Sequence, residues 1–168
     1  MLSGMSRAEQ ALELVDELDL ERYQGTWYEI ARLPNRFQSD CAGAVSAHYQ
    51  LRADGRVDVT NRCRRTDGGW IEAQGVARRA DDDGSPAALE VRFAPHWLSF
   101  LPFVWGDYRV IALGEDYDHA LVGSEDREFL WVLARERELP QATFDRLIER
   151  ARSQGFDTDQ LVRTQQSP

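Results

Sequence analysis

The sequence predicts an all-β fold: an eight-stranded antiparallel up-and-down barrel with an N-terminal helix and one C-terminal helix packed outside. Three observations predict it. From Gly25 onward apolar and polar residues alternate with a period of two, turn-forming clusters recur at short intervals, and a clear helical pattern returns only after residue 139. Successive side chains on a strand point to opposite faces, so this alternation indicates strands with one dry and one wet face.

The strands are placed by this alternation and by the turns between them. Val57 and Val59 alternate with polar residues, and so do Leu89, Val91 and Phe93. Clusters rich in Asp and Gly are typical of the turns of antiparallel meanders, and they occur at residues 53–55, 67–69, 81–86 and 114–118. The predicted strands are residues 25–33, 43–52, 56–63, 70–79, 87–94, 106–113, 118–124 and 128–135.

Two segments show helical spacing instead. Residues 6–18 carry apolar side chains at helical intervals with acids between them, which predicts a short amphipathic helix. Residues 140–153 place Phe144, Leu147 and Ala151 on one apolar stripe, which predicts a second helix.

The chain is expected to form one domain over residues 1–168, with the barrel at about 24–135, because no repeat or linker divides it. Eight consecutive antiparallel strands favour a closed barrel, since closure removes exposed sheet edges. A barrel of eight strands can hold one small ligand.

The net charge of −9 excludes nucleic acid as a partner, because phosphate binding needs clustered Lys and Arg. An anionic membrane surface would also repel a chain of this charge, so membrane contact is expected to be apolar or local. No apolar run reaches the ~20 residues of a spanning helix, and residues 1–20 lack the basic start and apolar centre of a signal peptide. As it stands, the sequence predicts a cytoplasmic or peripheral membrane protein. If a signal has been trimmed, a periplasmic or outer-membrane location is expected.

Cys41 and Cys63 lack the spacing and the nearby histidines of a zinc site, so we expect neither a metal nor a cofactor. With a turn near Asp54, position 45 lies opposite Cys63. Cys41 is then four residues further along, on the order of 13 Å away at ~3.3 Å per residue. A disulfide needs Cα atoms within about 7 Å, and only a bulge or a loop that folds back would close the gap. We therefore expect two free thiols.

Three motifs occur in order at the expected ends of the predicted strands, and together they resemble those of the lipocalin family. They are Gly25-Thr26-Trp27 in the first strand, the segment 114–123 around the turn between strands six and seven, and Arg135 at the end of the last strand. The resemblance covers roughly residues 20–165. It is strongest to the bacterial outer-membrane lipocalins and the plant temperature-induced lipocalins, through Trp27-Tyr-Glu-Ile-Ala31, Phe129-Leu-Trp131 and Gly155-Phe-Asp.

The resemblance implies structural roles for Gly25, Trp27 and Arg135. In the family the tryptophan closes one end of the barrel and the arginine packs across it, and a guanidinium over an indole face is a favourable cation–π pair. No catalytic role is expected for any of them.

The interior follows from strand parity, because side chains alternate along a strand and Trp27 is taken to point inward. Carried along the family's strand alignment, this parity predicts a largely apolar ligand site made of Glu29, Tyr49, Val57, Val59, Leu89, Val91, Phe93, Tyr108, Val110, His119, Leu121, Phe129 and Trp131.

Polar groups on this dry face need a partner or a ligand group, because an unpaired buried polar group is costly. Two interpretations of Glu29 remain open: a hydrogen bond to a neighbouring tyrosine, or recognition of a ligand headgroup. His119 is interpreted as packed or solvated near a loop.

The segment 93–105 contains no charged side chain and includes Pro95 and Pro102, which exclude a regular helix or a central strand. Its aromatic and leucine side chains suit peripheral membrane contact. A lid over the barrel and a dimer contact are the alternatives, and a monomer or a homodimer is expected. The residues concerned are Trp97, Phe100, Leu101, Phe103 and Trp105.

The function expected from these observations is the binding, transport or storage of a small amphiphilic lipid inside the barrel. The expected lipid is a fatty acid or a lysophospholipid, and the expected role is membrane maintenance. The alternatives are a haem or pigment binder, with His119, His96 or a tyrosine as ligand, and a small lipid-modifying enzyme. An enzyme is not expected, since the sequence has no Gly-x-Ser-x-Gly elbow and no phosphate-binding glycine loop.

Overall fold

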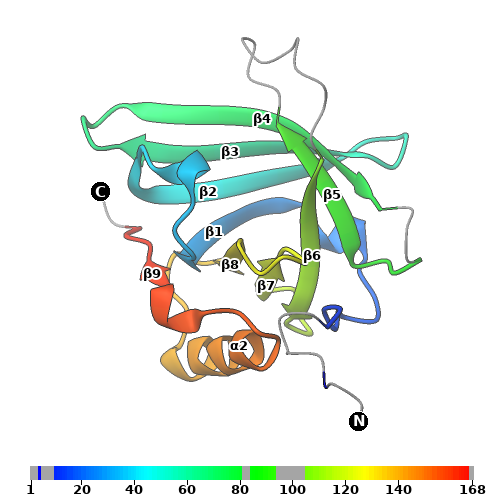
Figure 1. Cartoon of the computed structure of the whole chain (residues 1–168). Coiled ribbons are helices and arrows are strands. Elements are labelled where there is room, and N and C mark those ends of the chain that lie inside the picture. Colours follow the sequence, from blue (N-terminus) through cyan, green and yellow to red (C-terminus); the bar gives the residue numbers. More distant parts are fainter. Residues whose placement is uncertain (1–3, 5–9, 81–83, 94–104, 167–168) are drawn as a thin grey trace.

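A computed structural model of the chain describes residue 4 and residues 10–80, 84–93 and 105–166, and it shows a closed antiparallel barrel (Figure 1). Eight strands form the ring, and a short ninth pairs with the first. Because β1 pairs with both β8 and β2, the sheet closes on itself, which confirms the expected fold class. The strands are β1 (Gly25–Arg32), β2 (Cys41–Leu51), β3 (Val57–Arg65), β4 (Trp70–Arg79), β5 (Ala88–Phe93), β6 (Gly106–Leu113), β7 (His119–Gly123), β8 (Leu130–Ala134) and β9 (Val162–Arg163).

The helices of the described residues are short, apart from one that packs against the outside of the barrel. They are α1 (Leu20–Tyr23), the 3-10 turns η2 (Arg36–Gln38) and η4 (Thr158–Gln160), and α2 (Gln141–Ser153). The helix expected at 140–153 is confirmed as α2. It buries Phe144, Leu147 and Ala151.

The N-terminal helix expected at 6–18 is wrong for residues 10–18, which contain no helix, and residues 5–9 lie outside the described part. The apolar residues of this segment serve two different surfaces. Leu12 packs in a cluster beneath α2, whereas Leu18 packs in the barrel interior. One helical stripe cannot face both surfaces. The chain instead runs irregularly along the barrel, and the Val15 amide donates to the Val110 carbonyl.

The buried residues form two clusters on opposite sides of the barrel wall. The inner cluster fills the closed half of the barrel and consists of Leu18, Tyr23, Trp27, Ala47, Tyr49, Val57, Val59, Ala77, Ala87, Leu89, Tyr108, Val110, Ala120, Val122 and Leu133. The outer cluster lies beneath α2 and consists of Leu12, Ile30, Ala31, Leu33, Ile111, Leu121, Leu130, Val132, Ala134, Phe144, Leu147, Ala151 and Phe156.

The closed end of the barrel is plugged by Trp27, which is fully buried, with the Arg135 guanidinium 4.0 Å from its ring centre. The indole N–H donates to the Tyr23 carbonyl at 2.7 Å. The same guanidinium donates to the backbone carbonyls of Arg22, Tyr23, Thr26 and Tyr117. The structural roles expected for Trp27 and Arg135 match this geometry.

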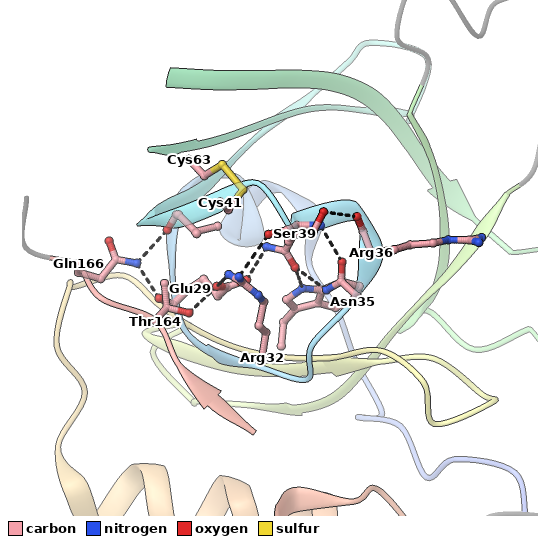
Figure 2. The surroundings of a disulfide bond; sticks show 12 residues. Glu29, Arg32, Asn35, Arg36, Ser39, Cys41, Cys63, Thr164 and Gln166 are labelled. Atoms are coloured by element: carbon pink, nitrogen blue, oxygen red, sulfur yellow. Dashed lines mark hydrogen bonds and ion pairs between the residues drawn. A yellow bond between two sulfur atoms is a disulfide. The ribbon is translucent and has the colours of Figure 1, made fainter. Parts of the chain in front are cut away.

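Cys41 and Cys63 form a disulfide at the open end, with Cα atoms 5.6 Å apart, so the expectation of two free thiols is wrong (Figure 2). The expected register holds from Leu51 opposite Val57 to Ser46 opposite Arg62. Beyond that point β2 contains two irregularities, between Ser46 and Gly43 and between Gly43 and Cys41. Each extra residue in a bulge shortens the reach of its strand, and Cys41 is thereby drawn back beside Cys63.

We predict that maleimide labels no thiol on denatured, unreduced protein and two after reduction. The bond spans a sequence separation of 22 residues. Because the cross-link restricts the unfolded chain, the double variant Cys41→Ala/Cys63→Ala should lose about 3 kcal/mol of unfolding free energy. Urea denaturation of the two proteins measures this loss, and two labels before reduction would contradict the assignment.

We predict that Arg135→Ala destabilises the protein by about 2–4 kcal/mol, because several charge-assisted hydrogen bonds to backbone carbonyls are lost at once. The control is Arg137→Ala. That side chain is exposed and stacks on Tyr28 at 4.8 Å, and its loss should cost less than about 1 kcal/mol. Equal losses in urea denaturation would show that Arg135 has no special role at the closed end.

Candidate ligand-binding site

The inner face of the barrel is the candidate site, because its closed half is largely apolar and its wall at Ala73 and Phe93 is exposed to solvent. Of the residues expected to bind ligand, six belong to the inner cluster and two more pack against it. The six are Tyr49, Val57, Val59, Leu89, Tyr108 and Val110, and the two are Val91 and Trp131.

The inner face of β4 and β5 is partly exposed to solvent. Val59, Gly75 and Phe93 lie directly opposite one another across these strands and therefore share the inner face. The Phe93 side chain is 37% exposed and its ring covers Gly75, where an added Cβ would lie 2.8 Å from the Phe93 Cδ1. Ala73, two residues before Gly75 on the same face, is also exposed. The inner wall therefore remains open to a ligand on this side.

The parity assumed for β7 is wrong. Ala120 and Val122 belong to the inner cluster, whereas Leu121 is fully buried in the outer cluster beneath α2. The register between β6 and β7 shifts between Val110 and Ala112, and one extra residue is enough to exchange the two faces. Alternation counted from Trp27 also predicts an inward Ala31, but Ala31 packs in the outer cluster after a similar shift in β1.

Two further expected site residues lie at the edges of the barrel. His119 is half-buried at the end of the β6–β7 turn, with its Nδ1 atom 2.8 Å from the Asp118 carboxylate. Phe129 precedes β8 at the open end and stacks on Trp131, with ring centres 5.7 Å apart.

Three buried tyrosines form the floor of the inner face. The Tyr108 hydroxyl is 2.7 Å from the hydroxyl of Tyr23 and 2.8 Å from that of Tyr49. Tyr23 also packs at a tilt against Trp27, with ring centres 4.9 Å apart, and so contacts the residue that plugs the closed end. Burial raises the pKa of Tyr49 to about 12, and it raises the pKa of Tyr23 and of Tyr108 well above the ordinary value. The floor is therefore polar but uncharged at neutral pH.

Glu29 lies at the open end, 2% exposed, and is fully partnered within the protein (Figure 2). Its carboxylate accepts from Arg32 Nη1 at 2.8 Å, from Gln38 Nε2 at 2.8 Å and from the Thr164 hydroxyl. The expected tyrosine partner is therefore replaced by an arginine and two other side chains. Both carboxylate oxygens already accept hydrogen bonds within the protein, so the described contacts do not indicate a ligand group here.

Gln38 connects the mouth loop to the barrel wall. Its amide oxygen accepts from the Trp131 indole N–H at 3.0 Å and from Asn35 at 2.7 Å, while its nitrogen donates to Glu29. Neither Gln38 nor Thr164 was predicted to take part in the site. Both lie outside the long strands, in segments without periodicity, so no pattern pointed to them.

The apolar segment 93–105 is described only at its two ends. Trp97, Phe100, Leu101 and Phe103 lie outside the described residues. The Trp105 ring is 3.8 Å from the Arg78 guanidinium carbon and 5.1 Å from that of Arg92, which places it against the outer face of β4 and β5.

Within the described part of the chain, no three His, Cys, Asp or Glu side chains are grouped to hold a metal ion. None of the helices described there has the length and apolar character needed to cross a bilayer.

We predict that stability falls as the pH rises from 10 toward 12. Burial places the folded-state pKa of Tyr49 at about 12 against 10.0 when unfolded. The unfolded chain therefore loses its proton first, and the contribution of the group is complete below pH 10 and is lost above it. Tyr49→Phe should make the decline of the melting temperature between pH 9 and pH 12 less steep. An unchanged slope would contradict the assignment.

Comparison with known proteins identifies the family. A family model described as a lipocalin-like domain matches residues 18–166. The chain is 40% identical to temperature-induced lipocalin-1 of Arabidopsis thaliana over 158 residues, covering 93% of this chain and 83% of that one. It is 38% identical to the outer membrane lipoprotein Blc of Escherichia coli K12 over 160 residues, covering 94% and 84%. Among solved structures, insecticyanin of the tobacco hornworm Manduca sexta superposes with a TM-score of 0.75 at 18% identity, covering 94% and 86%. The barrel, its plugged end and these matches together show that the chain belongs to the lipocalin family, whose members generally bind and transport small hydrophobic molecules.

Proposed function

We propose that the barrel carries a small amphiphile, a fatty acid or a lysophospholipid, with its acyl chain against the inner face of β3, β4 and β5. The observation that carries the proposal is the apolar inner wall of β4 and β5, where Ala73 and Phe93 are exposed to solvent beside the buried Val59 of β3. An acyl chain placed there gains ~0.8 kcal/mol for each CH₂ removed from water.

The tyrosine floor supports an uncharged end of the ligand at the bottom of the barrel, because a charged group next to three buried neutral phenols would lose its hydration. The polar end of the amphiphile would then remain near the mouth. Binding rather than catalysis is proposed, since most groups described on the inner face are apolar, and Glu29 and the three tyrosines are hydrogen-bonded within the protein. The position of His119 beside Asp118 at the closed end does not support haem ligation by this histidine.

We also propose that the protein matures in an oxidising compartment such as the periplasm. The Cys41–Cys63 bond supports this location, because disulfides persist where thiols are not kept reduced. The bacterial relatives named as outer membrane lipoproteins support it as well. The expected cytoplasmic location has no comparable support.

We predict that Phe93→Glu weakens fatty-acid and lysophospholipid binding at least about tenfold, or ~1.4 kcal/mol, because it places a charge against the acyl chain. Titration followed by tryptophan fluorescence and calorimetry measures the affinity. The control is Gln74→Glu, which adds a charge on the exposed outer face of the same sheet.

Three results would count against the proposal. They are saturable binding that Phe93→Glu leaves unchanged, equal weakening by the control, and no response of the parent protein to either lipid. Chemical turnover of the bound lipid, followed by mass spectrometry, would show an enzyme instead of a carrier.

A further inference from the structure

The barrel wall has a seam between β1 and β2 that these strands do not close themselves. They pair only from Gly25 opposite Tyr49 to Tyr28 opposite Ser46. Toward the open end the bulged part of β2 is held on β3 by the Cys41–Cys63 bond, and Ala44 adopts a positive φ of 49°. The edges of β1 and β2 therefore separate above Tyr28.

The segment Val162–Gln166, called the tail below, closes this seam. Its first two residues pair with β1, as Arg163 opposite Ala31 and Val162 opposite Arg32. The Thr164 amide then donates to the Ile30 carbonyl at 2.9 Å.

On the other side of the seam the tail contacts β2. The Ala44 amide donates to the Gln165 carbonyl at 2.7 Å. The Gln166 side-chain nitrogen Nε2 donates to the backbone carbonyl of Glu29 at 2.6 Å and to that of Val45 at 2.9 Å, and so bridges both strands (Figure 2).

The tail is attached by hydrogen bonds and by the Arg163 guanidinium, which lies 3.6 Å from the Phe144 ring centre on α2, and not by apolar burial. None of its five side chains is buried, and Val162 is 47% exposed. Hollows of about 420 Å³ and about 240 Å³ lie on its two sides, the first lined in part by Arg32, Gln38 and Val162 and the second by Gly43, Arg64 and Gln165. Segments with few buried apolar contacts and exposed hydrogen bonds open more readily than the core of a protein.

We propose that the tail is a detachable ninth strand, and that its release opens a side entrance between β1 and β2 through which the ligand enters and leaves. The passage of a ligand through this entrance rests on the proposed function, whereas the detachment of the tail does not. Glu29 and Gln38 lie behind the tail, so the entrance is polar where a headgroup passes, while the exposed inner wall at Ala73 and Phe93 accommodates the chain.

The first experiment measures detachment in the parent protein by amide hydrogen exchange. The Ala44 and Thr164 amides are bonded across the seam, whereas Val59 lies in the β3 ladder. If the tail detaches alone, the two seam amides should exchange together, roughly 100-fold faster than Val59. Protection of Ala44 equal to that of Val59 would overturn the proposal.

The second experiment weakens the tail and measures ligand kinetics. An added Cβ on Gly43 would lie 2.6 Å from the Gln165 carbonyl oxygen, so Gly43→Ala should displace the tail without changing it. The matched control is Gly106→Ala, whose Cβ would find its nearest neighbour at an ordinary 3.7 Å. A chain that ends at Leu161 removes the tail outright and tests the same point if Gly43→Ala fails to fold.

A gate changes rates and not the equilibrium. Stopped-flow measurement with a fluorescent fatty acid should show association and dissociation both about tenfold faster in Gly43→Ala and in the shortened chain, with Kd nearly unchanged. Unchanged rates would overturn the side entrance, and so would a weaker Kd at an unchanged association rate, because the tail would then be part of the binding wall. Failure of the parent to bind fatty acid refutes the proposed function and the entrance, and the exchange at Ala44 still decides whether the tail detaches.

Discussion

The contact on which the rest of the structure depends is the Arg135 guanidinium over the Trp27 indole. It joins segments that are far apart in the sequence, because its hydrogen bonds reach the end of α1, the start of β1 and the β6–β7 turn at Tyr117. The Trp27 N–H and the Arg135 guanidinium both bind the Tyr23 carbonyl, which fixes the position of the Tyr23 ring. The floor of the ligand site is thus held by the same cation that closes the barrel.

A second constraint is that the barrel does not close with fully regular strands. Register shifts in β1, β2 and β6 turn single residues from one side of the wall to the other. These shifts bring Cys41 to Cys63 and place Leu121 beneath α2. In β1 the shift lets Glu29 face inward while the next residues support the outer cluster.

The sequence predicted an element well where its apolar residues have a regular spacing and pack against one surface. All eight strands and α2 were predicted within a few residues, because the spacing of their apolar residues follows the surfaces that they bury. Parity failed at Leu121 and Ala31 for a common reason: a bulge adds a residue without changing the composition of the strand, so counting along the chain cannot reveal it. The helix expected at 6–18 failed because its leucines pack against two surfaces. The partners of Glu29 could not be anticipated, since Gln38 and Thr164 come from segments placed only by tertiary contacts.

The three tyrosines of the floor have a consequence that follows from counting hydrogen atoms. Three hydroxyls carry three protons, and the two hydrogen bonds that join them use two. The third proton is not used within the trio, and rotation of the hydroxyls can assign it to any of the three oxygens. The tyrosine trio can thus present a donor at one position and an acceptor at another without any movement of the backbone. If the proposed ligand reaches this floor, the trio would tolerate different polarity at its buried end, and it would select against charge more strongly than against shape.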